Sequence, residues 1–312
     1  MRLLRRQTAV LVATAFAIPT LAACGLSGDA LQSGGGGGSC SSDQPKAGTV
    51  SIGSANFPES QLLADIYSSA LKSAGVKTTT TDPIGAREAY LKALDDGSIQ
   101  LVPEYTGSLL TYLNPKATEK APEEVYAALI TTIPCSQLAL NPSQAQDSNA
   151  MVVTKATADK WNLKTVSDLA KHAGDVTIAA PPEFRSRDQG LVGLKSTYNF
   201  TPKNFLPLSA TPAIVSALKN NQAQAANIFS TDPSIKQNNF VILRDDKQLF
   251  GSDQVVPLIS RSAATPKVQV ALNKISAKLT TDNLGEMVKQ VVIDKKDPQA
   301  VADAFVKQQG LG

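Results

Sequence analysis

The stretch 85–108, GAREAYLKALDDGSIQLVPEYTGS, decides the fold of this chain. Its first half predicts a short helix, because apolar side chains recur at helical spacing in Ala86, Ala89, Tyr90, Ala93 and Leu94. Gly97 is expected to end that helix, since a residue without a Cβ adopts the left-handed cap conformation without strain. The apolar run 99–102 then predicts a strand covered on both faces, and Pro103 is expected to end its ladder. Residues 104–108 are expected to form a polar loop at the carboxyl end of that strand, where open α/β sheets bind ligands.

The segments around this stretch alternate between strand and helix patterns. Before it, the predicted strands 50–53 and 76–81 flank a helix whose first turn holds Pro58 and Glu59. This β-α-β-α-β order indicates the start of a doubly wound sheet. After it, helix patterns span 122–132, 191–198, 212–220, 266–279, 284–291 and 298–308, strand patterns span 149–153, 175–180, 225–229, 240–243 and 254–259, and a polar linker spans 135–147.

Two of the predicted strands, 149–153 and 254–259, bracket the middle of the chain. They imply a first domain that is interrupted by a second one. The predicted fold class is therefore α/β, with two lobes, a two-strand hinge and a ligand cleft between the lobes that closes by hinge bending. The predicted bounds are 48–150 plus 255–312 for lobe 1 and 151–254 for lobe 2.

The first 47 residues carry the signs of export. Three arginines (Arg2, Arg5 and Arg6) precede a mostly apolar run at 8–21, which is too short to cross a bilayer core of ~30 Å. The LAAC sequence that ends at Cys24 is typical of a lipobox, so 1–23 is a predicted signal peptide and Cys24 a predicted site of lipidation. An ordinary signal peptide with a chance cysteine is the alternative. Residues 24–47, which include the glycine run 34–38, are predicted to be a flexible tether.

These features predict an exported lipoprotein that is held on the outer face of the bacterial cytoplasmic membrane by its acyl chains alone, including palmitate. Removal of the signal leaves 30 − 3 = 27 basic residues against 27 acidic ones. A near-neutral body argues against nucleic acid as a partner. Cys40 and Cys135 form an even pair, for which one disulfide is the simplest interpretation and free thiols or a metal site the alternatives. With the single histidine His172 and no metal-ligand spacing, no metal or other cofactor is expected.

Four motifs follow one another in the body: GSANFPES at 53–60, GSIQLVPEYTGS at 97–108, EFRSRDQGLVGLKSTY at 183–198 and AANIFSTDPSI at 225–235. In this order they resemble the signature segments of the substrate-binding lipoproteins of glycine betaine, choline and carnitine (osmoprotectant) ABC importers. The resemblance implies a type II periplasmic-binding-protein fold. It also implies a monomer that captures a small solute, catalyses nothing and delivers the solute to the permease and ATPase subunits.

The first lobe offers seven candidate ligand contacts. Polar groups beside a helix N-terminus, in Ser54 and Asn56, attract a carboxylate, and Tyr105 offers an aromatic face to a cation. The other four candidates each have a structural alternative. Phe57 could instead be a hydrophobic staple and Arg87 a solvated side chain. Thr106 and Ser108 could instead cap the next helix.

The second lobe offers five more. Arg187 carries a guanidinium fork that suits a ligand carboxylate. The alternative is that Arg187 interacts with a charged side chain close to it in sequence, Arg185 or Asp188, instead of a ligand. Gln189 is either a ligand contact or, with Ser186, a capping box. The remaining candidates are the rings of Phe184 and Phe229 and the hydroxyl of Thr231. Core packing is the alternative for Phe229, and a helix cap is the alternative for Thr231.

The identity of the solute depends on few aromatic rings. A quaternary ammonium favours several electron-rich rings, and the candidates are Tyr105, Tyr198 and three phenylalanines in a chain with six tyrosines and one tryptophan. Glycine betaine, choline, carnitine or proline is the first prediction. A less cationic or more aromatic small molecule is the second. An exported enzyme, an adhesin and a sensor lobe are further alternatives, although the chain has no G-x-S-x-G elbow and no Walker loop.

Overall fold

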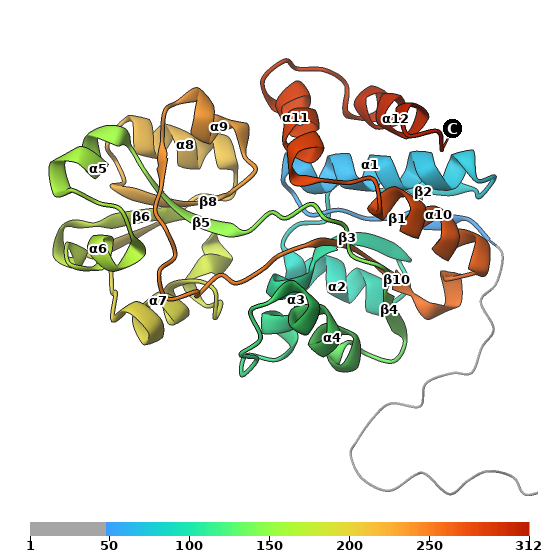
Figure 1. The fold of residues 1–312 in the computed structure, drawn as a ribbon, viewed down its shortest axis with the longest axis horizontal. Helices are drawn as coiled ribbons and strands as arrows, with labels where there is room; N and C mark the ends of the chain where they lie inside the picture. The colour runs from blue at the N-terminus through green and yellow to red at the C-terminus, as the bar shows by residue number, and fades with distance from the viewer. Residues whose placement is uncertain (1–47, 312) are drawn as a thin grey trace, which may run out of the picture. The chain divides into compact units, whose positions relative to one another are not determined.

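The computed structural model describes residues 48–311, whose strands form two separate mixed sheets (Figure 1). The first sheet has the order β2-β1-β3-β10-β4 and the second the order β7-β6-β8-β5-β9. The first consists of β1 Val50–Ile52, β2 Thr78–Thr80, β3 Leu101–Tyr105, β4 Gln137–Ala139 and β10 Val255–Ser260. The second consists of β5 Asn149–Val153, β6 Thr177–Ala180, β7 Asn204–Pro207, β8 Ala225–Phe229 and β9 Val241–Ile242.

Helices cover both faces of the first sheet. On one face, α1 packs with the three C-terminal helices in a single apolar cluster that includes Ile52 and Leu101. On the other, a second cluster joins α2, α3 and α4 to Val102 and Leu258. These helices are α1 Pro58–Ser73, α2 Arg87–Asp95, α3 Thr106–Leu113, α4 Pro122–Thr132, α10 Pro266–Ser276, α11 Thr281–Val292 and α12 Pro298–Gln308, with the short η3 Arg261–Ala263 after β10. All five residues of β3 are buried, as expected for a strand between two layers.

The second sheet is covered in the same way. Ile178 and Ala180 pack with one set of helices, while Ala179 and Ala226 pack with another on the opposite face. The elements are α5 Lys155–Trp161, α6 Val166–Ala170, α7 Leu191–Tyr198, α8 Thr211–Lys219 and α9 Pro233–Gln237, with the short helices η1 Ala173–Asp175 and η2 Pro182–Arg185.

Two chain segments connect the sheets, one before β5 and one before β10 (Figure 1). They run antiparallel and are bridged at Gln146 and Gln254. The Asp147 amide also donates a hydrogen bond to the Asp253 carbonyl at 3.0 Å. The first segment is held to β10 as well, because the Ser143 amide donates to the Val255 carbonyl at 2.8 Å. We call these paired segments, 143–148 and 251–254, the hinge.

The structure corrects several local predictions. Pro103 does not end its strand, which continues to Tyr105. It lies directly opposite Pro257 on the antiparallel β10. Opposed residues in an antiparallel ladder alternate between pairs that exchange hydrogen bonds and pairs that do not, and two prolines fit a pair of the second kind because neither has an N–H to donate. Glu104 and Tyr105 are therefore strand residues, and α3 begins at once with Thr106. The predicted linker 135–147 contains β4, which pairs with β10 at the edge of the sheet.

Within residues 48–311, no helix has the length and apolar character that a membrane span requires. The predicted signal peptide 1–23, the tether 24–47, the lipidation site Cys24 and the half-cystine Cys40 lie outside the described residues.

Candidate functional site

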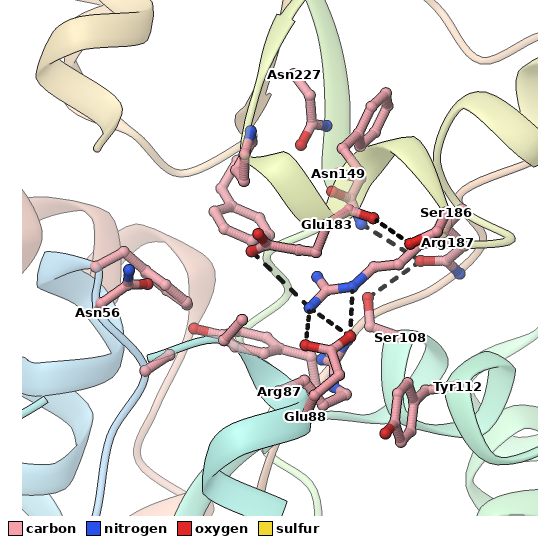
Figure 2. Close-up of a pocket in the computed structure, with 18 of the residues that line it drawn as sticks. Asn56, Arg87, Glu88, Ser108, Tyr112, Asn149, Glu183, Ser186, Arg187 and Asn227 are labelled. Carbon is pink, nitrogen blue, oxygen red and sulfur yellow. Dashed lines mark hydrogen bonds and ion pairs between the residues drawn. The ribbon is translucent and has the colours of Figure 1, made fainter. Parts of the chain in front are cut away.

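A cavity of about 310 Å³ is lined by residues from both lobes (Figure 2). From the first lobe come the loop before α1, the first turn of α2, the end of β3 and one face of α3. From the second come the start of β5, the segment around η2 and the end of β8. The carboxyl ends of several strands thus meet at one place, which is the usual ligand site of open α/β sheets.

Three rings pack against one another at this cavity. The Phe57 and Phe229 ring centroids are 4.9 Å apart, and each lies 6.2 Å from the Tyr105 centroid. They come from the loop before α1, the end of β8 and the end of β3. The Tyr105 hydroxyl donates a hydrogen bond to Glu59 Oε1 at 2.7 Å. Burial raises the pKa of this phenol well above its ordinary value, so it remains a donor. We call these rings the aromatic wall.

Arg87 is buried rather than solvated, which corrects one of the two sequence-based interpretations. Its Nε and Nη2 donate to the two oxygens of Glu104 at 2.8 and 3.0 Å, and the Tyr90 hydroxyl donates to Glu104 Oε1 at 2.7 Å. Burial alone would lower the pKa of Arg87, but the adjacent Glu104 carboxylate holds it well above its ordinary value. The cation lines the cavity while its charge is already matched.

Arg187 connects the two sides of the cavity. Its Nη2 donates to Glu88 Oε1 and Oε2 at 3.3 and 3.1 Å (Figure 2), and lies 3.9 Å from Glu183 Oε1. Its ion-pair partners are thus Glu88 and Glu183 rather than Asp188. Burial opposes ionisation of Glu88, but hydrogen bonds from its own backbone and from Arg187 lower the pKa of its carboxyl overall.

Gln189 contacts the opposite lobe instead of capping a helix. Helix α7 begins after Gly190, without a side-chain cap, so the predicted capping box with Ser186 is wrong. Gln189 Oε1 lies 3.1 Å from Ser108 Oγ, and its amide donates to the Phe250 carbonyl at 3.2 Å. Ser108 Oγ in turn lies 2.5 Å from Asp253 Oδ2 in the hinge. Gln189 therefore connects the second lobe to α3 directly and, through Ser108, to the hinge.

The cavity gathers nine of the predicted contacts, which are Asn56, Phe57, Arg87, Tyr105, Ser108, Phe184, Arg187, Gln189 and Phe229. Three others do not line it. Ser54 is buried and its carbonyl accepts from the Ile84 amide. Thr106 exchanges hydrogen bonds with Gln254 in the hinge, and the Thr231 hydroxyl donates to Glu59 Oε2 at 2.6 Å. Tyr198 is also elsewhere, with its hydroxyl bonded to Asp245.

Several lining residues were not predicted, including Glu88, Tyr90, Thr111, Tyr112, Asn149, Glu183, Thr211 and Asn227. A signal for two of them exists in the sequence. Thr111 and Tyr112 follow Ser108 at i+3 and i+4, so one helix face presents all three. Thr211 is the first residue of α8, which begins one residue earlier than the predicted 212. Among the described residues, no cluster of three or more His, Cys, Asp or Glu side chains is arranged to hold a metal ion.

Comparisons with known proteins place this chain in a family. A family model described as the substrate binding domain of ABC-type glycine betaine transport systems matches residues 48–308. The glycine-betaine-binding protein of Pseudomonas aeruginosa is 26% identical over 281 residues, 85% of this chain and 89% of that protein. A carnitine transport binding protein of Listeria monocytogenes is 26% identical over 267 residues, 83% of this chain and 86% of that protein.

A solved structure leads to the same assignment. The crystal structure of a glycine betaine/carnitine/choline ABC transporter is 25% identical, has a TM-score of 0.66, and covers 84% of this chain and 99% of that one. The predicted two-lobe, type II periplasmic-binding-protein fold is thereby confirmed. The chain belongs to the family of substrate-binding domains of ABC-type glycine betaine transport systems, whose members bind a solute rather than transform it.

Proposed function

We propose that this chain captures a quaternary ammonium compatible solute of the glycine betaine, choline or carnitine type, or proline, and delivers it to an ABC permease. The observation that supports this most strongly is the aromatic wall, in which rings from three separate elements lie within 6.2 Å of each other. A cation within ~6 Å of such a face gains about 0.5–2 kcal/mol. Hinge closure excludes water, which strengthens that attraction.

The charges of the lining suit a zwitterion. Glu88, Glu183 and Asp188 face two arginines there, and Arg87 is matched by Glu104 outside the lining. Three carboxylates then remain against Arg187 alone, so the net charge of the lining favours a cationic group on the solute. Arg187 is the donor for a solute carboxylate, and it reaches the solute by exchanging its partner Glu88, which is half exposed and easily hydrated.

We propose the nine predicted residues that line the cavity as the ligand contacts, with Arg187 and Tyr105 as the principal ones. We also propose lobe bounds of 48–150 plus 255–312 and 151–254. The less cationic solute is the second candidate, because two of the three rings in the wall are phenyl groups, which attract cations less than an indole does.

Replacing Tyr105 with alanine is expected to weaken glycine betaine binding at least tenfold, since a loss of about 1.4 kcal/mol corresponds to that factor. Isothermal titration calorimetry of residues 48–312 with glycine betaine, choline, carnitine and proline measures the change. Tyr126→Ala is the matched control, because its hydroxyl bonds to the Ala139 and Leu140 carbonyls away from the cavity. Wild-type protein that binds none of the four solutes would refute this choice of solute.

The membrane attachment is also our proposal. Acyl chains on Cys24 would hold the chain on the outer face of the cytoplasmic membrane, and the Cys40–Cys135 disulfide would fix the end of the tether to the first lobe. Thiol titration of the unreduced, denatured chain without Cys24 is expected to find no free thiol. A count of two free thiols contradicts the disulfide.

A further inference from the structure

Two buried carboxyl groups outside the cavity lining meet at the hinge. Glu59 lies in the first turn of α1 and is 4% exposed, and Asp147 lies in the first hinge segment and is 0% exposed. Neither forms an ion pair with a cation of residues 48–311. Ionised carboxylates are costly to bury without such a partner. Something other than a cation must therefore offset the cost of burying these two carboxyl groups.

The two carboxyl groups connect both lobes to the aromatic wall. Glu59 accepts hydrogen bonds from the Tyr105 hydroxyl of the first lobe and from Thr231 Oγ1 of the second, at 2.7 and 2.6 Å. Asp147 Oδ1 accepts from the Thr231 amide at 3.0 Å and from Ser230 Oγ at 3.2 Å. The bond between Thr231 and Glu59 joins the second lobe to α1 of the first, so opening of the lobes at the hinge would break it.

The placement of the two carboxyl groups favours a proton. Thr231 donates to both of them, through its amide to Asp147 Oδ1 and through its hydroxyl to Glu59 Oε2, and this holds them close together. Asp147 Oδ2 is buried and no donor of the described residues reaches it. Two buried ionised carboxylates without a cation partner repel each other, so the pair is stable there when one of them is protonated. Burial, followed by the facing Glu59, raises the pKa of Asp147 well above its ordinary value, and burial raises that of Glu59.

We infer that Glu59 and Asp147 form a proton-operated latch: closure of the lobes on the solute takes up one proton, and opening releases it. The pair acts through others and does not touch the solute. Glu59 positions the Tyr105 ring, and both carboxyl groups hold Thr231. The inference rests on the proposed function in one respect, the solute used to close the lobes.

The sign of the pH dependence follows from the raised pKa of the closed pair. Opening returns the carboxyl groups to water, where their pKa is about 4. Affinity is therefore highest at low pH and falls as pH rises above about 4 toward the closed-state pKa, by up to tenfold per pH unit for one proton. Other titratable groups face the pair, namely Tyr105 on β3 and Asp232 before α9. Asp253, across the hinge, has a pKa raised to about 7 by burial and contributes its own pH dependence.

Proton uptake separates the latch from these other groups. Glycine betaine is titrated into wild type, Glu59→Gln and Asp147→Asn in buffers of different ionisation enthalpy, at mildly acidic, neutral and mildly alkaline pH. Each variant replaces one carboxyl group with an amide of similar shape, which neither takes up a proton nor repels the remaining carboxylate. We expect wild type to take up about one more proton per bound solute than either variant. Equal uptake in all three would overturn the latch.

Asp65→Asn is the matched control. Asp65 is on the same helix, and burial raises its pKa to about 6, but it faces Asp297, Lys72 and Asp303 instead of the hinge. Its variant should keep the wild-type proton uptake, and a reduction equal to that of Glu59→Gln would overturn the assignment to the hinge.

Failure of glycine betaine, choline, carnitine and proline to bind wild type at any pH would refute the proposed solute and not the latch. The latch is then decided on the free chain, because a closure that takes up a proton is also favoured by protons in the absence of a solute. Small-angle X-ray scattering should show wild type becoming more compact as pH falls from neutral toward about 4. The change should be smaller in Glu59→Gln and in Asp147→Asn, and an equal change in all three proteins would overturn the inference.

Discussion

Replacing Glu104 with alanine is expected to lower the free energy of unfolding by about 3–5 kcal/mol, because the Arg87 guanidinium is then buried without its partner. Glu104 is 0% exposed and accepts three side-chain hydrogen bonds, two from Arg87 and one from Tyr90. It also accepts one from the Tyr105 amide. Urea unfolding followed by circular dichroism measures the change.

Two variants make this prediction specific. Glu88→Ala removes the carboxylate next to Arg87 in sequence, but that side chain is 47% exposed and pairs with Arg187, so the loss should be within about 1 kcal/mol. The double variant Arg87→Met, Glu104→Leu should recover much of the stability lost in Glu104→Ala, because it leaves no buried charge unpaired. Similar losses in Glu88→Ala and Glu104→Ala would contradict the prediction.

Replacing Gly190 with alanine is expected to cost about 3 kcal/mol of stability and to weaken solute binding. A Cβ at this position would lie 2.0 Å from the Phe184 carbonyl oxygen and 3.0 Å from that of Arg187. Both atoms are backbone, so the segment that carries Arg187 and Gln189 must move. Thermal or urea unfolding measures the first effect and calorimetry the second.

Gly285→Ala is the control for this substitution. Gly285 lies within α11, where an added Cβ meets nothing within 4 Å. Alanine there should leave stability unchanged or raise it by up to about 1 kcal/mol, since it restricts the unfolded chain. A loss in Gly285→Ala as large as that in Gly190→Ala would show that close backbone packing is not the cause.

Local patterns predicted the elements whose ends are marked by local chemistry. Helix α12 begins at Pro298, directly after an Asp297 cap, as its sequence indicates. Helix α11 begins three residues earlier than predicted, because a capping box between Thr280 and Asn283 precedes its apolar stripe. Strand β4 has only three residues and is defined by its pairing with β10. Such a strand depends on a tertiary partner that is distant in sequence, so periodicity could not reveal it.

The same distinction explains the site. The rings of the aromatic wall could be predicted because each ends a strand or precedes a helix, where open sheets place their ligand contacts. Arg87 was harder to place, since its partner Glu104 is 17 residues away on a strand that was expected to have ended. Thr231 contacts Glu59 across 172 residues. Sequence spacing cannot reveal a contact that exists only after two lobes meet.

The position of β10 between β3 and β4 has a consequence for the order in which the molecule is completed. All strands of the second sheet come from one uninterrupted stretch, whereas the first sheet waits for a strand that begins at Val255. A chain that emerges amino end first therefore carries an unpaired β3 edge through about half of its synthesis, and such edges invite aggregation. The first sheet, whose strand β1 is synthesised before all the others, is therefore the last of the two sheets to be completed.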